Sequence, residues 1–355
     1  MRLTRAWRFR SEALPKRPDR TYDRYVSAAN ETIIGAGSST RPPAGARPTL
    51  SGMTGWDDDE RAVLVALLRA RPCGLSWSQI AAEVADAGSA RAVWDQHLPR
   101  DLFSADTDED VVLRAARDDV RAWREADFDF LTFLDADYPA QLREVHQMPP
   151  VLFVRGAPRT DEIAVSVVGS RKASSTALRN ARDIAAGLVA NQVTVLSGLA
   201  EGIDTVAHET ALSTGGRTVA VIGTGITKTF PAANRALQEK IAVDGLVLSQ
   251  FWPDAPPTKQ SFPMRNATMS AYGRATIVVE AGEQSGARIQ ARTAVAHGRP
   301  VILMDAVAHG TNWGRVLVGA PGVFVAADVT AALDVVRRVL AQSNQLTELL
   351  AMVDE

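Results

Sequence analysis

The stretch AVSVVGSRKASSTALRNARDIAAGL, residues 164–188, decides the fold of this chain. It begins with an apolar run that ends at the turn Gly169-Ser170-Arg171, and an amphipathic segment follows. Apolar residues recur in that segment at the spacing of one helical face, which predicts a helix near residues 175–190. A buried strand, a tight glycine turn and a helix in this order predict one unit of a parallel α/β sheet.

The same alternation of strand and helix recurs along the chain. Further strands are expected at residues 128–134, 151–156, 193–198, 218–223, 246–251, 275–281, 300–305 and 322–326. Continuous apolar strands that alternate with helices are typical of a parallel sheet covered on both faces. The sequence therefore predicts a doubly wound α/β domain with a mostly parallel sheet, whose ligands bind where the strands end.

Composition divides the chain into four segments. Residues 1–50 hold nine Arg, one Lys and four acidic residues with little apolar periodicity, which predicts a basic, disordered extension, with a nucleic-acid-binding arm as the alternative. Residues 51–105 contain three short amphipathic stretches and predict a small helical module; no basic recognition helix is evident there, so we expect a packing role. Residues 106–327 are expected to form the α/β domain, and residues 328–355 have the length of one or two helices.

The composition of the whole chain excludes several classes of protein. The formal net charge of its 355 residues is −2, so any nucleic-acid site has to be a local patch. Cys73 is the single cysteine, which excludes a disulfide framework and a cysteine-based zinc site. The N-terminus lacks the apolar core of a signal peptide, and no apolar run approaches ~18 residues. We therefore expect a cytoplasmic protein with no membrane partner.

Glycines, hydroxyl groups and cations gather in the loops that follow the predicted strands. These loops comprise residues 169–172, 197–204, 223–228, 262–266 and 280–286. Glycine allows a ligand to approach the backbone closely, and the N-terminus of each following helix offers N–H groups to an anion. Arg171, Lys228 and Arg265 supply positive charge among these loops. The sequence therefore predicts an anion site that several loops share.

The common nucleotide motifs fit these loops poorly. GTGITK, residues 223–228, has the first two glycines of a dinucleotide-binding G-x-G-x-x-G but has Lys228 in place of the third. No acidic residue ends the second strand, where a ribose-binding side chain belongs. A P-loop, G-x-x-x-x-G-K-[ST], is absent from the sequence. We expect no nicotinamide or other cofactor.

Few candidate catalytic residues lie in or next to the loops that follow the predicted strands. They are Ser197, Asp204, His208, Glu280 and Glu283. Ser197 lacks the G-x-S-x-G turn of serine hydrolases, Asp204 is interpreted as a helix cap, and His208 as a packing residue. No spacing typical of metal ligands is present, so we expect neither a metal site nor an enzyme.

Aromatic residues near the loops could stack on bases, although each taken singly is more often part of a core. They are Phe230, Phe251, Trp252, Phe262 and Tyr272.

Taken together and in order, the motifs of this region resemble one family. VVGSR, SGLAEGIDTVAH, GTG with FPAAN, LVLSQF, FPMRN and VVEAGEQSGARIQAR are similar to the DNA-processing protein A (DprA/Smf) family, over about residues 125–325. The module at residues 51–105 stands where many relatives carry a SAM-like domain. The resemblance implies an extended Rossmann-like domain that binds single-stranded DNA without catalysis, forms a homodimer, and helps to load a RecA-type recombinase during natural transformation.

The resemblance also implies which residues form the site. The DNA-binding residues would be Arg171, Lys228, Arg265 and Asn266. The pocket loops would include Gly169, Ser170, Ser197, Gly198, Gly202, Asp204, Gly223, Gly225, Ser285 and Gly286. Two features depart from the family pattern: Ala267 stands where a second arginine is usual, and residues 328–355 are too few for the winged-helix domain that many members carry.

Two other functions remain open at this point. One is a nucleotide-binding sensor or nucleotide-processing enzyme on a related fold, although EAGEQSG at residues 280–286 lacks the PGGxGT loop of nucleotide–sugar-cleaving relatives. The other is a DNA-binding component of a phage-defence system.

Overall fold

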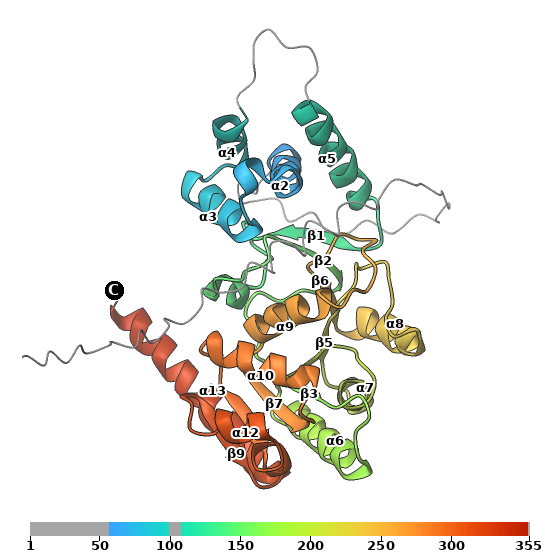
Figure 1. Ribbon diagram of the computed structural model, residues 1–355, viewed down its shortest axis with the longest axis vertical. Coiled ribbons are helices and arrows are strands. Elements are labelled where there is room, and N and C mark those ends of the chain that lie inside the picture. Colours follow the sequence, from blue (N-terminus) through green and yellow to red (C-terminus); the bar gives the residue numbers. More distant parts are fainter. Residues whose placement is uncertain (1–56, 99–107, 354–355) are drawn as a thin grey trace, which may run out of the picture.

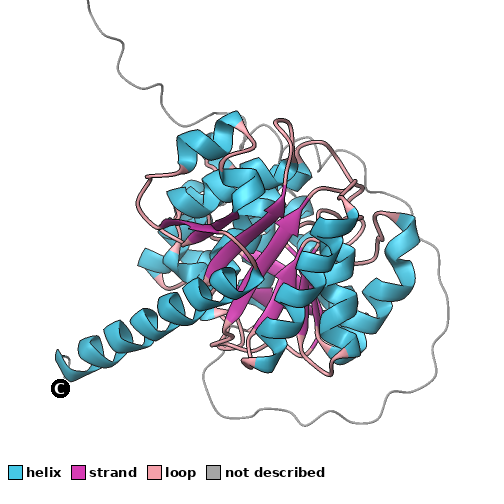
Figure 2. Cartoon of the chain, turned by 90° about the horizontal axis from the view of Figure 1, so that it is seen from below, coloured by secondary structure: helices cyan, strands magenta, loops and turns pink. Residues whose placement is uncertain are grey.

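A nine-stranded sheet with helices on both faces forms the centre of the molecule (Figures 1 and 2). The computed structural model describes residues 57–98 and 108–353, so the expected basic extension at residues 1–50 lies outside the described residues. The strands are β1 (Asp129–Thr132), β2 (Val151–Gly156), β3 (Ala164–Gly169), β4 (Thr194–Ser197), β5 (Thr218–Val221), β6 (Leu246–Ser249), β7 (Ala275–Glu280), β8 (Val301–Met304) and β9 (Val323–Ala326). The predicted α/β class is confirmed.

The strand order creates a switch point in the middle of the sheet. The order is β1-β2-β6-β5-β4-β3-β7-β8-β9, with β1 and β2 antiparallel to their neighbours and the other strands parallel. From β3 the chain proceeds outward through β4, β5 and β6, then returns to the other side of β3 as β7. Loops that leave β3 and β7 therefore diverge, and such a crevice is where doubly wound sheets bind ligands.

Helices cover each face of the sheet through separate apolar clusters. The helices of the α/β region are α6 (Ser175–Ala190), α7 (Ile203–Ser213), α8 (Arg235–Asp244), α9 (Ser261–Tyr272), α10 (Gly286–Ala296), α11 (Asp305–Ala308), α12 (Asn312–Leu317) and α13 (Val329–Val353), with short 3-10 turns at Ala140–Glu144 and Ala232–Asn234. Helices α6, α7 and α13 pack on one face, and α9 and α10 pack on the other. Helix α13 follows the last strand.

Residues 262–266 form part of helix α9, so the expectation of a loop there is wrong. Ten of the twelve residues of α9 are buried, with polar and apolar side chains alike. A helix buried on all sides shows no amphipathic period, and the period is the signal on which sequence reasoning depends.

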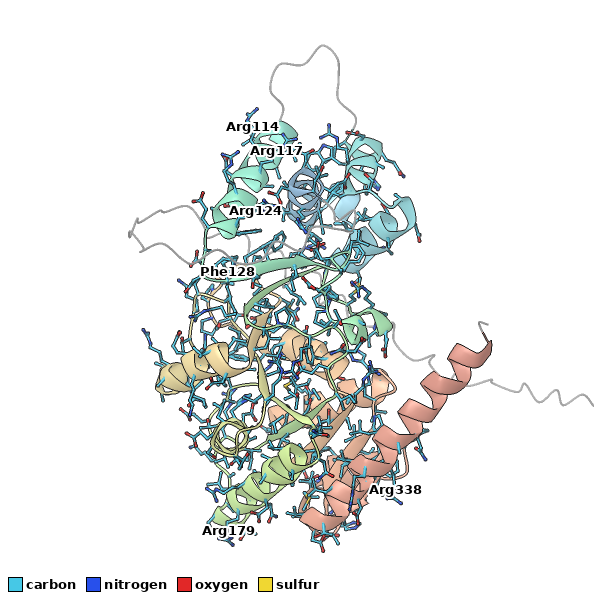
Figure 3. All side chains as sticks on the ribbon, turned by 180° about the vertical axis from the view of Figure 1, so that it is seen from behind. Arg114, Arg117, Arg124, Phe128, Arg179 and Arg338 are labelled. Atoms are coloured by element: carbon cyan, nitrogen blue, oxygen red, sulfur yellow. The ribbon has the colours of Figure 1, made fainter. Side chains whose placement is uncertain are left out.

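A small helical module precedes the sheet, as predicted. It contains α2 (Asp58–Ala70), a 3-10 turn (Pro72–Gly74), α3 (Trp77–Ala87) and α4 (Ala90–His97), and α5 (Asp108–Arg124) packs against α2. Ser76 and Gln79 form a capping box at the start of α3, and Gly88 ends it with φ of 68°. Arg117 lies on α5 (Figure 3). Its guanidinium forms an ion pair with Asp59 at 2.7 Å.

An aromatic cluster joins this module to the sheet. Trp77 and Trp123 from the module lie 5.3 and 5.9 Å from Trp252, measured between ring centroids, and Trp123 lies 4.9 Å from Phe153 on β2. Trp252 is buried, as are Phe251 and Tyr272, so these three rings belong to the core and not to a base-stacking surface. The module and the α/β domain therefore share one continuous core.

No helix within residues 57–98 and 108–353 is both long and apolar enough to cross a membrane.

His208 on α7 is a buried packing residue. It is fully buried, and its Nδ1 lies 2.7 Å from Oγ1 of Thr218 on β5. Burial, with a smaller contribution from the positive charge of Arg265, lowers the pKa of His208 to about 3.

This pKa makes stability depend on pH. The unfolded chain takes up a proton on His208 near pH 6.5, whereas the folded chain does so only near pH 3, so acid favours unfolding between these values. One such group contributes at most about 1.4 kcal/mol per pH unit. When the pH is lowered from 6.5 to about 5, we expect the free energy of unfolding to fall less in His208→Gln than in the wild type. Urea denaturation at each pH measures this free energy. His297, whose burial lowers its pKa to about 4, is present in both proteins and cancels in the comparison. An equal loss in the two proteins would contradict the prediction.

Candidate functional site

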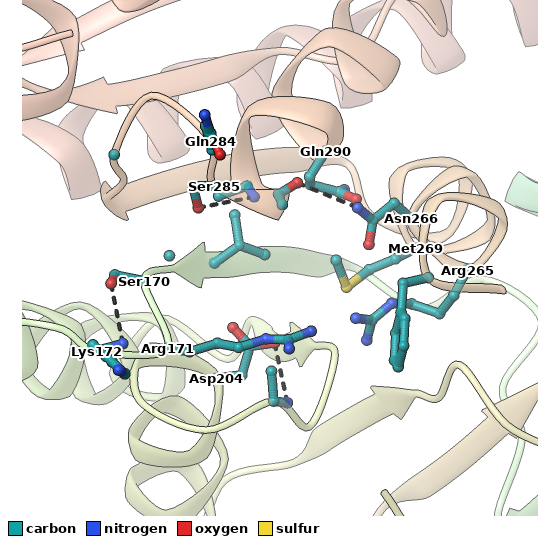
Figure 4. A pocket seen from close by; sticks show the side chains of 17 residues that line it. Ser170, Arg171, Lys172, Asp204, Arg265, Asn266, Met269, Gln284, Ser285 and Gln290 are labelled. Carbon is teal, nitrogen blue, oxygen red and sulfur yellow. Dashed lines mark hydrogen bonds between the residues drawn. The ribbon is translucent and has the colours of Figure 1, made fainter. Parts of the chain in front are cut away.

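A cavity of about 630 Å³ opens at the switch point of the sheet (Figure 4). The loop after β3, the N-terminal turn of α7, helix α9, and the loop between β7 and α10 line it. Its volume falls in the range of about 300–1,000 Å³ that is usual for sites of small ligands. A second cavity of about 130 Å³ adjoins it and shares Arg171, Phe262 and Arg265 as walls.

Arg171 is an exposed cation at the mouth of the cavity. Its guanidinium carbon lies 5.5 Å from the centre of the Phe262 ring, and the side chain has no ion-pair partner among the described residues. The loop that carries it is held in place, because the carboxylate of Glu280 accepts hydrogen bonds from the backbone N–H and hydroxyl of Ser174. A charge fixed in this way, with its guanidinium free of acids, is suited to an anionic ligand.

Arg265 has a different role, because it is only 5% exposed. Its Nη1 donates to the carbonyl oxygens of Gly198 at 2.5 Å and Val221 at 2.8 Å. Burial lowers the pKa of Arg265, and the nearby carboxylate of Asp204 opposes that effect. Arg265 therefore ties helix α9 to the ends of β4 and β5, while it still lines both cavities.

Asp204 braces the loop before α7 and does not cap that helix. The N-cap of α7 is Gly202, with φ of 81°, so the interpretation of Asp204 as the cap is wrong. The Asp204 carboxylate accepts from the backbone N–H groups of Gly198 at 3.1 Å and Ala200 at 3.4 Å. Burial raises its pKa, and the charge of Arg265 acts against this.

Glycines let these loops come together. A Cβ on Gly198 would overlap the Arg265 guanidinium, and one on Gly202 would overlap the carbonyl oxygen of Ser170. Gly223 lies against the ring of Phe262, and Gly225 against the carbonyl of Trp252. Close approach is thus the reason for glycine at these four turns.

The remaining expected residues fall into two groups. Gly169, Ser170, Asn266, Ser285 and Gly286 line the cavity. Ser197 is buried behind it, and its hydroxyl donates to the carbonyl of Val167 at 2.7 Å.

Lys228 does not reach this cavity. It forms an ion pair with Asp254 at 3.2 Å and lines a separate hollow that includes Arg235 and Glu239. The structure therefore brings Arg171, Arg265 and Asn266 together and places Lys228 apart from them; a role of Lys228 in binding stays a prediction.

Two polar residues of the cavity, Lys172 and Gln290, were not among the expected site residues, although Lys172 lies in the expected loop at residues 169–172. Lys172 follows Arg171 directly and adds a second exposed cation. Gln290 lies on the buried face of α10, whose other members are Ala287, Ala291 and Ala294. A single amide among alanines on an inward face is the signal that would have identified it.

Among the described residues, no group of His, Cys, Asp or Glu is arranged to hold a metal ion. Of the aromatic residues near the loops, Phe230 and Phe262 lie beside the cavities, with ring centroids 5.6 Å apart.

The fold and this cavity are those of a Rossmann-like α/β protein with a ligand crevice at its switch point. Residues 129–317 match the family described as DNA recombination-mediator protein A, and the chain belongs to that family.

Known relatives agree with this assignment. The DNA processing protein DprA of Streptococcus pneumoniae is 39% identical over 193 residues, which are 52% of this chain and 67% of that protein. Protein Smf of Synechocystis is 41% identical over 177 residues, which span only 44% of its length. The X-ray structure of the S. pneumoniae protein covers 79% of this chain and 98% of its own, with 28% identity and a TM-score of 0.60. DNA processing protein A of Helicobacter pylori, whose structure describes a single-stranded DNA binding mode, shares the fold at 22% identity with a TM-score of 0.52, over 59% of this chain and 97% of its own.

A substitution at Gly198 tests whether Arg265 ties helix α9 to the ends of β4 and β5, because Gly198 lies directly against the Arg265 guanidinium. We expect Gly198→Ala to lower the free energy of unfolding by about 1–3 kcal/mol, because the new methyl group displaces the Arg265 guanidinium from its two carbonyl partners. The control is Gly282→Ala, on the rim of the same cavity, where a Cβ would meet no atom within 4 Å. Thermal denaturation of both variants gives the answer, and equal melting temperatures would show that Arg265 is not held as described.

Proposed function

We propose that this protein binds single-stranded DNA without catalysis and assists a RecA-type recombinase in the cytoplasm, as in natural transformation. The observation that carries the proposal is the exposed guanidinium of Arg171, which lies over the Phe262 ring at the mouth of the cavity without an acidic partner among the described residues. The family and the described binding of single-stranded DNA by the H. pylori protein support it.

The surroundings of Arg171 suit both parts of a nucleotide chain. Lys172 and the N-terminus of α10 stand at the same cavity and favour phosphate. Phe230, with 41% of its surface exposed, and Phe262 offer ring faces on which a base can stack. Stacking tolerates every base, so this combination predicts binding with little sequence preference.

The acidic groups around the cavity argue against hydrolysis. Asp204 is held by two backbone N–H groups, Glu280 by Ser174, and the carboxylate of Glu283 accepts from the N–H of Asn312. Each of these carboxylates already serves as a structural acceptor and is not poised to move a proton.

Arg171 gives the sharpest test of the DNA site. Each phosphate that a protein neutralises on a single strand contributes about −0.7 to the slope of log K against log salt. We expect Arg171→Ala to weaken binding of a short oligonucleotide and to make that slope shallower by about 0.7. Fluorescence anisotropy at several salt concentrations measures both quantities.

Arg179→Ala is the matched control, since Arg179 is an exposed arginine on α6 (Figure 3) whose side chain, among the described residues, bonds to Thr176 of its own helix. It removes the same charge and should leave the slope unchanged. Full affinity and an unaltered slope in Arg171→Ala would remove Arg171 from the site. Free nucleotides as competitors in the same titration test the alternative of a nucleotide sensor.

Two protein partners belong to the proposal. The recombinase contact is placed on the α/β domain, because the family match begins at residue 129. A homodimer is proposed through the edge that β9 leaves at one end of the sheet among the described strands, where Val325 is exposed.

Removal of residues 1–50 tests the proposal that the recombinase binds to the α/β domain. We expect the shortened chain to bind DNA and to accelerate loading of a bacterial RecA onto single-stranded DNA within a few-fold of the full chain. The rate of recombinase filament formation measures loading, and sedimentation of the same samples measures the oligomeric state. Complete loss of loading by a folded, shortened chain would place the recombinase contact on the extension.

A further inference from the structure

Gln290 is a buried polar side chain without a partner. It is 1% exposed, it lines the cavity at the switch point, and neither its Oε1 nor its Nε2 has a hydrogen-bond partner among the described residues. An unpaired buried polar atom costs about 1–3 kcal/mol, so such a group calls for a specific reason.

Packing does not supply that reason. The neighbours of Gln290 on the inward face of α10 are Ala287, Ala291 and Ala294, and an apolar residue would suit this face. Asn266 on the facing helix α9 does not use the amide either, because its Nδ2 donates to the carbonyl of Gly286 at 3.4 Å (Figure 4). The carboxamide of Gln290 is therefore left unpaired in the wall of the cavity.

The two ends of the cavity differ in chemistry. Exposed cations, Arg171 and Lys172, stand at its mouth with the N-terminus of α10, where Ser285 caps the helix. Buried amides, Gln290 and Asn266, line it deeper between α9 and α10. A ligand that spans both ends carries an anion on one side and paired hydrogen-bond donors and acceptors on the other.

We propose that the cavity takes one nucleotide unit, with its phosphate at Arg171 and Lys172 and the edge of its base against the Gln290 carboxamide. This inference rests on the proposed DNA-binding function and specifies how that site holds the strand. A carboxamide presents one acceptor and two donors, and the edge of every base offers a donor beside an acceptor. Rotation of the amide by half a turn exchanges its oxygen and nitrogen, so it pairs with any of the four bases.

Gln290→Leu in the full chain tests the inference. Leucine keeps the bulk of the side chain and removes both polar atoms. Isothermal titration with thymidine 5′-monophosphate and with 2-deoxyribose 5-phosphate separates the contribution of the base from that of the phosphate. We expect the wild type to prefer the nucleotide by about tenfold, and the variant to lose most of this preference.

The melting temperature distinguishes a binding residue from a structural one. If Gln290 serves the ligand, Gln290→Leu should melt at or above the temperature of the wild type, because an unpaired buried group has been removed. A clear fall in melting temperature would assign Gln290 to the fold and overturn the inference. Gln284→Leu, on the exposed rim of the same cavity, is the matched control and should keep the preference for the nucleotide. Should Gln290→Leu fail to fold, Gln290→Ala carries the same test of preference.

Binding of a thymidine oligonucleotide by the same proteins separates the two proposals. If the wild type and Gln290→Leu bind the oligonucleotide with the same affinity, and also bind the nucleotide with the same affinity, the base contact is overturned. The DNA-binding function then stays intact. Preference of the wild type for the nucleotide, without any binding of the oligonucleotide, supports the base contact and overturns the DNA-binding function.

Discussion

The arrangement of the site depends on two buried groups of opposite charge, Arg265 and Asp204, and on their hydrogen bonds to the backbone. Neither group lies at the surface, and burial disfavours the charged form of each, as the opposite shifts of their pKa values show. The cost is offset by hydrogen bonds from both partners to the backbone at Gly198, Ala200 and Val221. Removal of one partner would leave the other charge buried, so the strand ends and helix α9 are fixed together.

The two arginines at the cavity differ in mobility. Arg265 is held by hydrogen bonds to the backbone, whereas the guanidinium of Arg171 is exposed. Arg265 donates its hydrogen bonds to backbone carbonyl groups and helps to form the cavity wall. Arg171 lies over the Phe262 ring, and its charge faces solvent. The difference follows from position: Arg265 comes from a helix enclosed on all sides, and Arg171 from a turn at the end of β3. Because the wall is preformed and the cation is already exposed, less conformational entropy of the protein is lost when a flexible ligand binds.

Much of the fold could be predicted from the sequence, because continuous apolar strands and amphipathic helices leave a regular pattern. The limits of β2 agree to the residue with the expected strand at residues 151–156. Helix α9 could not be found in this way, because enclosure removes its period. Of the site, the turn with Arg171 follows from the pattern alone. The separation of Lys228 depends on the ion pair with Asp254, a contact that local sequence does not encode.

The two edges of the sheet are unequal, and this has a consequence for assembly. Along β1 the helical module lies close to the sheet (Figure 1). The ring of Trp123 meets Phe130 of β1 edge-on, with 4.9 Å between the ring centroids. At the opposite end β9 carries no further strand within the described residues. A sheet with both edges open can add copies without end, as in a fibre. If the proposed homodimer forms through the β9 edge, it would have twofold symmetry and would use up that edge in both copies, so growth would stop at two.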